Sequence, residues 1–137
     1  MFTGSFGKTI DLLQRSMDVI VLRRNVIANN IANSDTPNFK RTSVSFESQL
    51  KRALDSEKVR PPLQFATHER HIPFYRKIDY RSVRPRRVLD YLTTGKNNGD
   101  NVDIEEETMM SMQNQLLYQT YAAVLNSEIN RVNLVLR

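Results

Sequence analysis

Cysteine and tryptophan are absent from this chain of 137 residues, and glycine is scarce, with only four residues. Without cysteine there is no disulfide, no thiolate metal site and no cysteine nucleophile. The low glycine count disfavours an all-β sandwich rich in tight turns. Apolar residues make up 39% of the chain, whereas compact globular domains contain about half. We therefore expect one modest domain without a large core of its own.

Long apolar runs are also missing. The aliphatic run over residues 19–22 is followed by Arg23 and Arg24, and no apolar run approaches the roughly 20 residues that a membrane-spanning helix needs. The amino terminus lacks the basic region, apolar stretch and small-residue cleavage site of a signal peptide. We expect no transmembrane segment and no cleaved signal peptide, so that any export from the cytoplasm uses another route.

Helical periodicity dominates both ends of the chain. Over residues 6–33, apolar side chains recur in steps of three and four, interrupted only where Arg24 takes the expected apolar position, and predict one seam of a coiled coil about 40 Å long. The positions of this first seam are Leu13, Met17, Ile20, Ile27 and Ile31. Beyond Ile104 the same spacing predicts a second helix of roughly 50 Å. Its seam and flanking positions include Leu117, Tyr121, Leu125, Ile129 and Val132.

The second long helix has a well-marked start. Asp103 is placed to cap the first backbone N–H groups, and Glu106, three residues later, completes the pattern of a capping box. Glu105 and Glu107 add negative charge at the positive end of the helix dipole. We interpret these glutamates as a solvent-facing helix start, because consecutive carboxylates without a pocket do not indicate acid-base catalysis.

The middle of the chain has a weaker pattern. Phe46, Leu50 and Ala53 predict a short amphipathic helix, whereas Pro61, Pro62, Pro73 and Pro85 interrupt the following segment. Alternation of apolar and charged residues over 72–83 permits one or two short strands. We predict a mainly α fold in which long terminal helices pair as a coiled coil around an irregular insert. The expected organisation is one domain over 1–137, with helices over 1–33 and 101–137 and a turn and basic insert over 34–100.

Two paired helices cannot cover apolar stripes on more than one face. Val19, Leu22 and Val26 flank the first seam, and Leu117 and Val124 flank the second. Because isolated helices gain most of their stability from packing, neighbouring copies or other proteins are expected to complete the burial. The terminal helices of the monomer are therefore predicted to be loose.

Asparagine is concentrated at the end of the first helix, at Asn25, Asn29, Asn30 and Asn33. Each costs something like 0.6 kcal/mol relative to alanine in a helix interior, or about 2 kcal/mol together. Asn29 and Asn33 lie four residues apart, where their amides can bond across a helix contact or cap the last carbonyls. The alternative is a set of surface amides near a fraying terminus, and composition alone leaves both open.

The residues that follow predict a fixed turn. Thr36 is pushed toward extended geometry by Pro37, and Pro37-Asn38 suits a turn whose third position has a positive φ. The segment "NVIANNIANSDTPNFKR" resembles the amino-terminal signature of bacterial flagellar rod and hook proteins, Ala-Asn-Asn-x-Ala-Asn-x-x-Thr-x-Gly-Tyr-Lys-Arg. Matching or related positions of this turn motif are Ala28, Asn29, Asn30, Ala32, Asn33, Thr36, Pro37, Asn38, Phe39, Lys40 and Arg41. Phe39 replaces Tyr, and Asn38 replaces Gly, a mild departure because Asn tolerates positive φ.

A second segment, "NNGDNVDIEEETMMSMQNQLLYQT", is similar to the carboxy-terminal signature of the proximal rod branch of this family. The positions that carry this similarity are Asn101, Val102, Asp103, Glu105, Glu107, Asn114, Gln115, Leu116, Tyr118 and Gln119. The short length of the chain and the segments "SDTPNFKRTSVSFESQL" and "THERHI" suit the same branch. Two separated motifs in the right order cover both ends of the chain, whereas the basic middle is only loosely similar.

The resemblance implies a structural subunit of the proximal rod of the flagellar basal body, in which terminal helices pack in layers around a channel and transmit torque. It implies export from the cytoplasm through the flagellar type III apparatus without cleavage, and a place in the periplasm-spanning rod. The implied partners are further copies of the chain, neighbouring rod proteins, the adaptor that joins rod to membrane ring, and the export gate. It implies no enzymatic activity, cofactor, nucleic acid or small-molecule substrate.

Other sites are weakly indicated. His68 and His71 form a His-x-x-His pair, with Glu69 and Asp79 as poor candidates to complete a zinc site, and we interpret the histidines as surface residues. No phosphate-binding loop, dinucleotide fingerprint or Ser-His-Asp arrangement is found. We therefore predict no catalytic, cofactor-binding or metal-binding residues.

A net charge of +5 and a basic run raise an alternative function, a nucleic-acid-binding helical module. The run contains Arg70, Arg76, Lys77, Arg81, Arg84, Arg86 and Arg87, with Phe74, Tyr75 and Tyr80 between them. Such a run is more often a solvated face or a contact with an acidic neighbour, for which the acidic start of the second long helix is a candidate. A generic coiled-coil adaptor would explain the heptads but not the asparagine turn.

Overall fold

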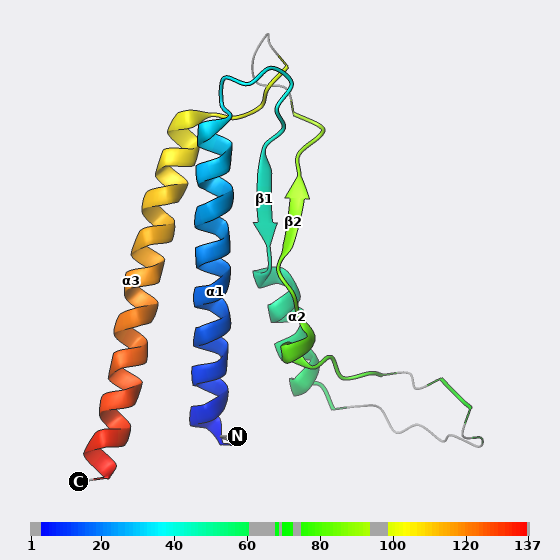
Figure 1. Cartoon of the computed structure of the whole chain (residues 1–137). Coiled ribbons are helices and arrows are strands. Elements are labelled where there is room, and N and C mark those ends of the chain that lie inside the picture. Colours follow the sequence, from blue (N-terminus) through cyan, green and yellow to red (C-terminus); the bar gives the residue numbers. More distant parts are fainter. Residues whose placement is uncertain (1–3, 61–67, 69, 73–74, 94–98, 137) are drawn as a thin grey trace. The chain divides into compact units, whose positions relative to one another are not determined.

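The computed structural model describes residues 4–60, 68, 70–72, 75–93 and 99–136. The chain forms two compact units, one made of Met1–Val44 and Arg87–Arg137 and the other of Ser45–Arg86. The helices and strands follow in the order α1, β1, α2, a 3₁₀ turn, β2 and α3. The prediction of a mainly helical fold with long terminal helices is confirmed (Figure 1). The single domain over 1–137 stays a prediction.

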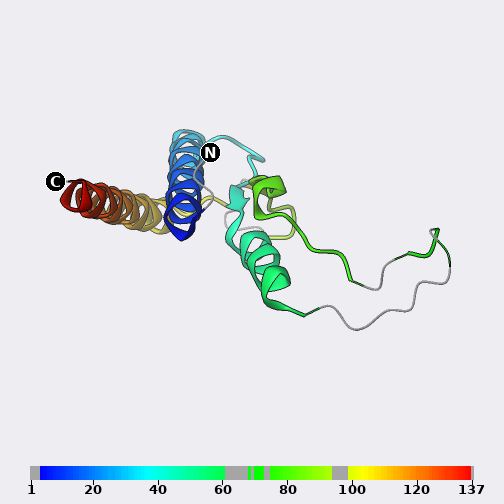
Figure 2. The same ribbon diagram turned by 90° about the horizontal axis from the view of Figure 1, so that it is seen from below.

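The first unit is built on two antiparallel helices, α1 (Ser5–Ala32) and α3 (Ile104–Val135). Figures 1 and 2 both show them side by side near the start of α3, with α3 diverging from α1 toward its carboxy-terminal end. Apolar burial is concentrated on α1, where Val19, Ile20, Val26 and Ile27 are buried. The core is therefore narrow, as the low apolar content predicts.

The start of α3 is capped as the sequence predicts, but without a capping box. The Asp103 carboxylate accepts hydrogen bonds from the backbone N–H groups of Glu105 and Glu106. The Glu106 carboxylate does not reach back to Asp103, because both of its oxygens accept from the guanidinium of Arg41. The capping-box prediction is therefore wrong, and Glu106 has a tertiary role instead.

The two strands, β1 (Thr42–Ser45) and β2 (Arg86–Leu89), form a small antiparallel sheet. The Asp90 N–H donates to the Arg41 carbonyl at 2.9 Å, which continues the pairing beyond the strands. The strands expected over 72–83 are not found among the described residues of that segment, where Tyr80–Ser82 instead forms a 3₁₀ turn. Every residue of β2 is exposed, so β2 lacks the alternation by which strands are recognised in a sequence.

The second unit contains the short helix α2 (Glu47–Lys58), which confirms the prediction of an amphipathic helix there. Ala53 is fully buried on its inner face. The hydroxyl of Ser56 accepts from the N–H of Ile78 at 3.0 Å, and the Tyr75 hydroxyl donates to the Ser56 carbonyl. These contacts fasten the segment before the 3₁₀ turn to α2.

Within the part of the chain that the structure describes, no helix is long and apolar enough to cross a membrane. Pro61, Pro62, Pro73, Phe74 and Glu69 lie outside the described residues. Predictions that involve those positions therefore fall outside the described residues and stay predictions.

Candidate functional site: the helix junction and the face of α3

The asparagines at the end of α1 have specific partners. Asn30, buried in the first unit, donates from Nδ2 to the carbonyl of Thr42 at 2.8 Å, and its Oδ1 accepts from the N–H of Thr42 at 3.1 Å. The amide thus pairs with the start of β1 as a neighbouring strand would. Both backbone groups of Thr42 are satisfied by one side chain, which offsets the poor helix propensity of asparagine.

Asn33 caps the end of α1. Its Nδ2 donates to the backbone carbonyl of Asn29 at 2.8 Å and to the Asn29 side-chain oxygen at 3.1 Å, while its Oδ1 accepts from the hydroxyl of Thr36. Of the two roles that the sequence allowed for this pair, carbonyl capping is the one observed. The amides of the turn motif are therefore not merely surface residues at a fraying terminus.

The turn that follows has the geometry that the sequence predicts. Asn38 has a φ of 60° and is the one non-glycine residue with positive φ in the described part of the chain. Gly99, with a φ of 82°, lies against it, and a Cβ atom on Gly99 would come within 2.6 Å of the Asn38 side-chain oxygen. Glycine is therefore favoured there by its backbone conformation, and a side chain at this position would also displace the Asn38 amide.

Arg41 joins the end of the turn to the first turns of α3. Its Nε donates to Oε1 of Glu107 at 2.6 Å, and its two terminal nitrogens each donate to one oxygen of Glu106 at 3.2 Å. Only 1% of the Glu107 side chain is exposed, which corrects the interpretation of the three glutamates as a solvent-facing helix start. A buried carboxylate of this kind depends on its partner, because an unpaired buried charge costs several kcal/mol.

The pKa of Arg41 reflects this environment. Burial alone would lower the pKa of the guanidinium, but the hydrogen bond and charge of Glu107, together with the charge and hydrogen bond of Glu106, outweigh burial and raise it. Arg41 thus remains positively charged at any pH at which the chain is folded.

A second set of contacts surrounds Arg41 and reaches the loop after β2. Its backbone N–H donates to Oδ1 of Asn101 at 2.6 Å, and Nδ2 of Asn101 donates to the Asp90 carbonyl at 3.0 Å. Lys40 donates to the backbone carbonyls of Thr93 and Gly99 at 3.2 and 2.9 Å. We call residues 29–42, 90–93 and 99–110 together the helix junction.

Asp90 is the ionisable group of the helix junction whose pKa falls. The hydroxyl of Thr93 donates to its carboxylate at 2.6 Å and is the main cause. The backbone N–H groups of Leu92 and Thr93 and the positive charge of Arg41 lower the pKa further. Hydrogen bonds from the loop residues Leu92 and Thr93 thus stabilise the charged form of Asp90.

The carboxy-terminal motif divides between the helix junction and the shaft of α3. Asn101, Asp103 and Glu107 belong to the junction, and Val102 is buried beside them. Asn114 lies on the inner face of α3 and donates from Nδ2 to the carbonyl of Ile20 at 2.9 Å. The remaining residues of the motif, Glu105, Gln115, Leu116, Tyr118 and Gln119, are exposed.

The predicted seam residues differ in burial. On α1, Ile20 and Ile27 are buried, and Leu13, Met17 and Ile31 are half-buried. On α3, Tyr121, Leu125 and Val132 are half-buried, whereas Leu117 and Ile129 are exposed. In the turn motif, Phe39 and Lys40 are half-buried, and Ala28, Ala32 and Pro37 are exposed. The assembly role assigned to all of these residues stays a prediction.

The outer face of α3, which we define by the exposed side chains of Met109, Met112 and Leu116, lies on the side of the helix opposite the buried Asn114. No charged residue occurs over residues 108–127 of the chain. Neighbouring exposed apolar side chains of this kind are typical of an interaction site.

Sequence reasoning did not predict that the polar residues Asn30, Glu107 and Asn114 are buried. Each belongs to one of the two family motifs, so the motifs marked them without saying what they contact. Among the described residues, no group of three or more His, Asp or Glu side chains could hold a metal ion. The described contacts hold the helix junction together by hydrogen bonds and ion pairs, and they leave apolar side chains of α3 exposed.

Comparison with known proteins defines the class more closely. A family described as flagella basal body rod protein matches residues 22–40. The flagellar basal body rod protein FlgB of Borreliella burgdorferi is 39% identical over 134 residues, covering 98% of this chain and 99% of the relative. FlgB of Borrelia hermsii is 39% identical, covering 96% of this chain and 98% of the relative, and FlgB of Bacillus subtilis is 34% identical, covering 96% and 95%.

The chain belongs to the family of flagellar basal body rod proteins, and its full-length similarity is to FlgB. It is thus a structural subunit of the bacterial flagellar rod, which assembles with other flagellar components. Nothing in the comparisons favours the nucleic-acid-binding alternative.

Proposed function

We propose that this chain builds the proximal rod by packing α1 and α3 against the helices of neighbouring subunits, in layers around a central channel. The observation that carries the proposal is the exposed, charge-free face of α3. Fully burying one leucine or methionine side chain contributes about 1.5–3 kcal/mol, so several such residues on one helix supply a substantial driving force for association. A single copy leaves that surface in water.

The residues proposed to form these contacts are the seam positions of the two helices. Those that are already buried, Ile20 and Ile27, hold α1 within the chain, whereas Leu117 and Ile129 are exposed and available to a neighbour. The half-buried positions serve both roles. In this proposal, the helix packing that starts within one chain continues between neighbouring chains of the rod.

The helix junction is proposed to be the rigid part of the subunit. Arg41, Asn30 and Asn101 connect the end of α1, the first strand and the start of α3 through short hydrogen bonds. A subunit that transmits torque needs its two helices fixed to each other at one end at least. The turn motif supplies that fixed end.

Export and the more specific partners also belong to this proposal. The chain is made in the cytoplasm, leaves it uncleaved through the flagellar export apparatus, and is placed next to the export gate and the adaptor protein. A narrow core fits passage as an unfolded or nearly unfolded chain, with ordering afterwards against neighbours at a cost in conformational entropy. The rod interface must exceed that cost.

The test uses aspartate substitutions at exposed positions. Leu117→Asp and Ile129→Asp place a charge where an assembled rod buries an apolar side chain, so we expect loss of motility and absence of the chain from purified basal bodies. Asn133→Asp, which adds the same charge at an exposed polar position of α3, is the matched control and should assemble. Normal motility of both seam variants would contradict the proposal.

A further inference from the structure

The strand β2 and the loop after it carry a row of exposed apolar side chains. Val88 and Leu89 are exposed, and Tyr91 and Leu92 are 73% and 96% exposed. Together with Arg87, which precedes them, we call these residues the β2 edge. Within the described residues, β2 pairs only with β1, and all of its side chains are exposed. An uncovered edge strand with apolar side chains is a typical place for another chain to bind.

The loop that carries Tyr91 and Leu92 is held in place, although both side chains are exposed. Oδ1 of Asp90 accepts from the N–H of Leu92 at 3.1 Å, and the Asp90 carbonyl accepts from Nδ2 of Asn101 at 3.0 Å. Because the backbone is already fixed, burying these side chains against a partner costs less conformational entropy than ordering a free loop would. The β2 edge is therefore prepared for binding within the single chain.

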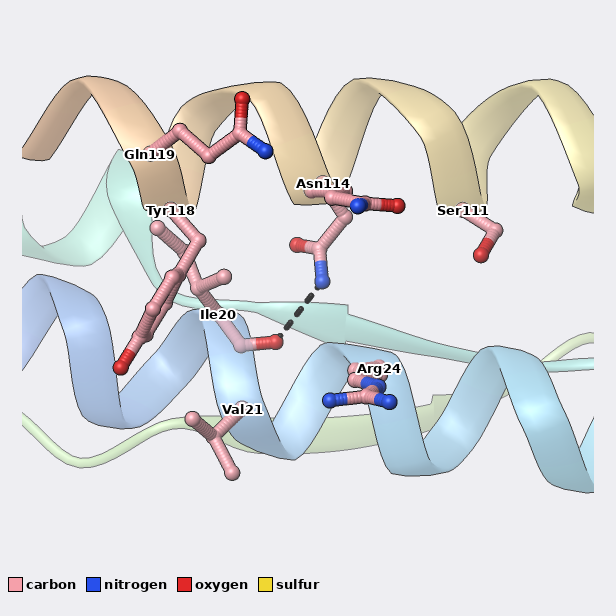
Figure 3. A pocket seen from close by; sticks show the side chains of 8 residues that line it. Ile20, Val21, Arg24, Ser111, Asn114, Tyr118 and Gln119 are labelled. Carbon is pink, nitrogen blue, oxygen red and sulfur yellow. Dashed lines mark hydrogen bonds between the residues drawn. The ribbon is translucent and has the colours of Figure 1, made fainter.

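The outer face of α3 is a second uncovered surface of the same unit. In Figure 3, Asn114 points from α3 toward α1, and its hydrogen bond to the Ile20 carbonyl at 2.9 Å marks the inner side of α3. At 3.6 residues per turn, Glu105 lies on the opposite side, in line with the outer face of α3. The side chain of Glu105 is exposed. It therefore places a negative charge at the start of this apolar face.

The two surfaces are complementary in charge as well as in apolar character. Arg87 begins the β2 edge, and Glu105 precedes the outer face of α3. Both are exposed, and neither belongs to an ion pair in the part of the chain that the structure describes. The carboxylate of Asp90 is bonded to Thr93 within its own loop. An apolar row that begins with a cation thus matches an apolar row that begins with an anion, and such complementarity favours one register of binding.

The two surfaces belong to opposite edges of the first unit. Within this unit, α3 bonds to α1 through Asn114, α1 bonds to β1 through Asn30, and β1 pairs with β2. Figures 1 and 2 both show α1 and β1 between α3 and β2. The β2 edge of one chain is therefore separated from its own α3 face and is available to the α3 face of a second copy.

We propose that the β2 edge of one copy binds the outer face of α3 of a second copy, with Arg87 paired to Glu105 and with Tyr91 and Leu92 packed on the apolar side chains. This rests on the proposed function, in which neighbouring subunits bury the exposed face of α3, and it names a surface that covers part of that face. The β2 edge and the outer face of α3 are different surfaces of one subunit. Such a contact is heterologous and propagates into a ring or a helical array, as a rod requires.

Disulfide trapping tests the contact, because the chain has no cysteine of its own. A chain with both Leu92→Cys and Met112→Cys, two exposed positions, is oxidised in isolated basal bodies and as concentrated purified protein. We expect a ladder of dimers, trimers and larger products made of this chain alone, since a heterologous contact continues from copy to copy.

The matched control combines Leu92→Cys with Gln113→Cys. Gln113 is also exposed, but it lies about 100° further around α3 than Met112. The ladder should be lost in this control, because cysteines whose Cα atoms are more than about 7 Å apart form no disulfide without backbone movement. Equal yields from the two chains, a ladder in neither sample, or cross-links to a different rod protein would overturn the proposal.

Exchange of the two charges tests the ion pair at exposed positions, where folding is not at risk. In the Leu92→Cys and Met112→Cys chain, Arg87→Glu alone and Glu105→Arg alone should each lower the yield of cross-linked products about fivefold, since one exposed ion pair contributes up to roughly that factor. The chain with both charge substitutions should recover the original yield. Lys51→Glu, the same charge change at an exposed position of α2, is the control and should leave the yield unchanged. No recovery in the chain with both charge substitutions would contradict the pairing of Arg87 with Glu105.

The failure of this interface can be told apart from the failure of the proposed function. If Leu117→Asp prevents rod incorporation while the Leu92→Cys and Met112→Cys chain enters basal bodies without cross-linking, the proposed function stands and this interface is wrong. If Leu117→Asp and Ile129→Asp both support normal motility, the proposed function itself is contradicted.

Discussion

The helix junction and the shaft of α3 lie in the same unit but use opposite kinds of contact. In the junction, Arg41, Asn30 and Asn101 satisfy buried polar groups at distances of 2.6–3.1 Å within one chain. Along α3, apolar side chains such as Met112 and Leu116 remain more than 60% exposed. One region is held together by hydrogen bonds within the single chain, whereas the other leaves large apolar side chains exposed.

The difference shows how a small chain becomes part of a large assembly. Polar networks fix geometry because each member has few acceptable positions, whereas an apolar face adapts to whichever surface buries it. We therefore expect the junction to define the shape of the subunit and α3 to supply its affinity for other subunits. Breaking each region in turn should give different phenotypes.

The largest effect is expected from removing the charge that holds Glu107. Arg41→Ala leaves a buried carboxylate without its partner and should lower the free energy of unfolding by about 3–5 kcal/mol, measured by chemical denaturation. The double variant Arg41→Met with Glu107→Leu replaces the pair by apolar groups and should recover most of that loss. A double variant as unstable as Arg41→Ala would show that the ion pair is not what Arg41 contributes.

Comparing two aspartate substitutions separates folding from assembly. Ile27 is 4% exposed, so Ile27→Asp should destabilise the monomer by several kcal/mol. Leu117 is 42% exposed, so Leu117→Asp should change monomer stability by less than about 0.5 kcal/mol while preventing rod incorporation. Thermal unfolding of both purified variants checks this, and equal destabilisation would erase the distinction between the two regions.

The asparagines of the turn motif should differ among themselves. Asn30→Ala leaves both backbone groups of Thr42 without the Asn30 amide and is expected to cost about 2–3 kcal/mol. Asn33→Ala removes hydrogen bonds at the carboxy-terminal end of α1 and should cost about 1 kcal/mol. Denaturation midpoints would rank the two variants. The reverse order would mean that capping, and not strand pairing, holds the junction.

The smallest effect concerns the pKa of Asp90 and the pH dependence of stability that follows from it. The pKa of Asp90 is lower in the folded chain than in the unfolded chain. Its contribution to the free energy of unfolding is therefore fully present above about pH 4, the ordinary pKa of aspartate. This contribution is lost as the pH falls through the lowered pKa of the folded state. Carbon NMR of the side-chain carboxyl should show Asp90 titrating below the ordinary aspartate value. In Thr93→Val the pKa should return toward the ordinary value. No change on that substitution would exclude the Thr93 hydroxyl as the cause.

Sequence reasoning identified the elements whose signals are local. The capping by Asp103 and the positive φ of Asn38 follow from residues next to one another, and both helices follow from their periodicity. The pairing of Arg41 with Glu107 joins residues far apart in the chain, and no local pattern encodes it. Strand β2 was missed because all of its residues are exposed. Asn114 was recognised only as part of a motif, because a heptad pattern counts apolar residues and passes over a buried amide.

Amide hydrogen exchange on the purified monomer and on isolated basal bodies tests the central comparison most directly. In the monomer, the backbone N–H groups of Arg41, Thr42 and Glu107 should be protected, whereas those of the carboxy-terminal half of α3 should exchange rapidly and become protected only in basal bodies. Equal protection along the whole of α3 in the solitary monomer would contradict the account.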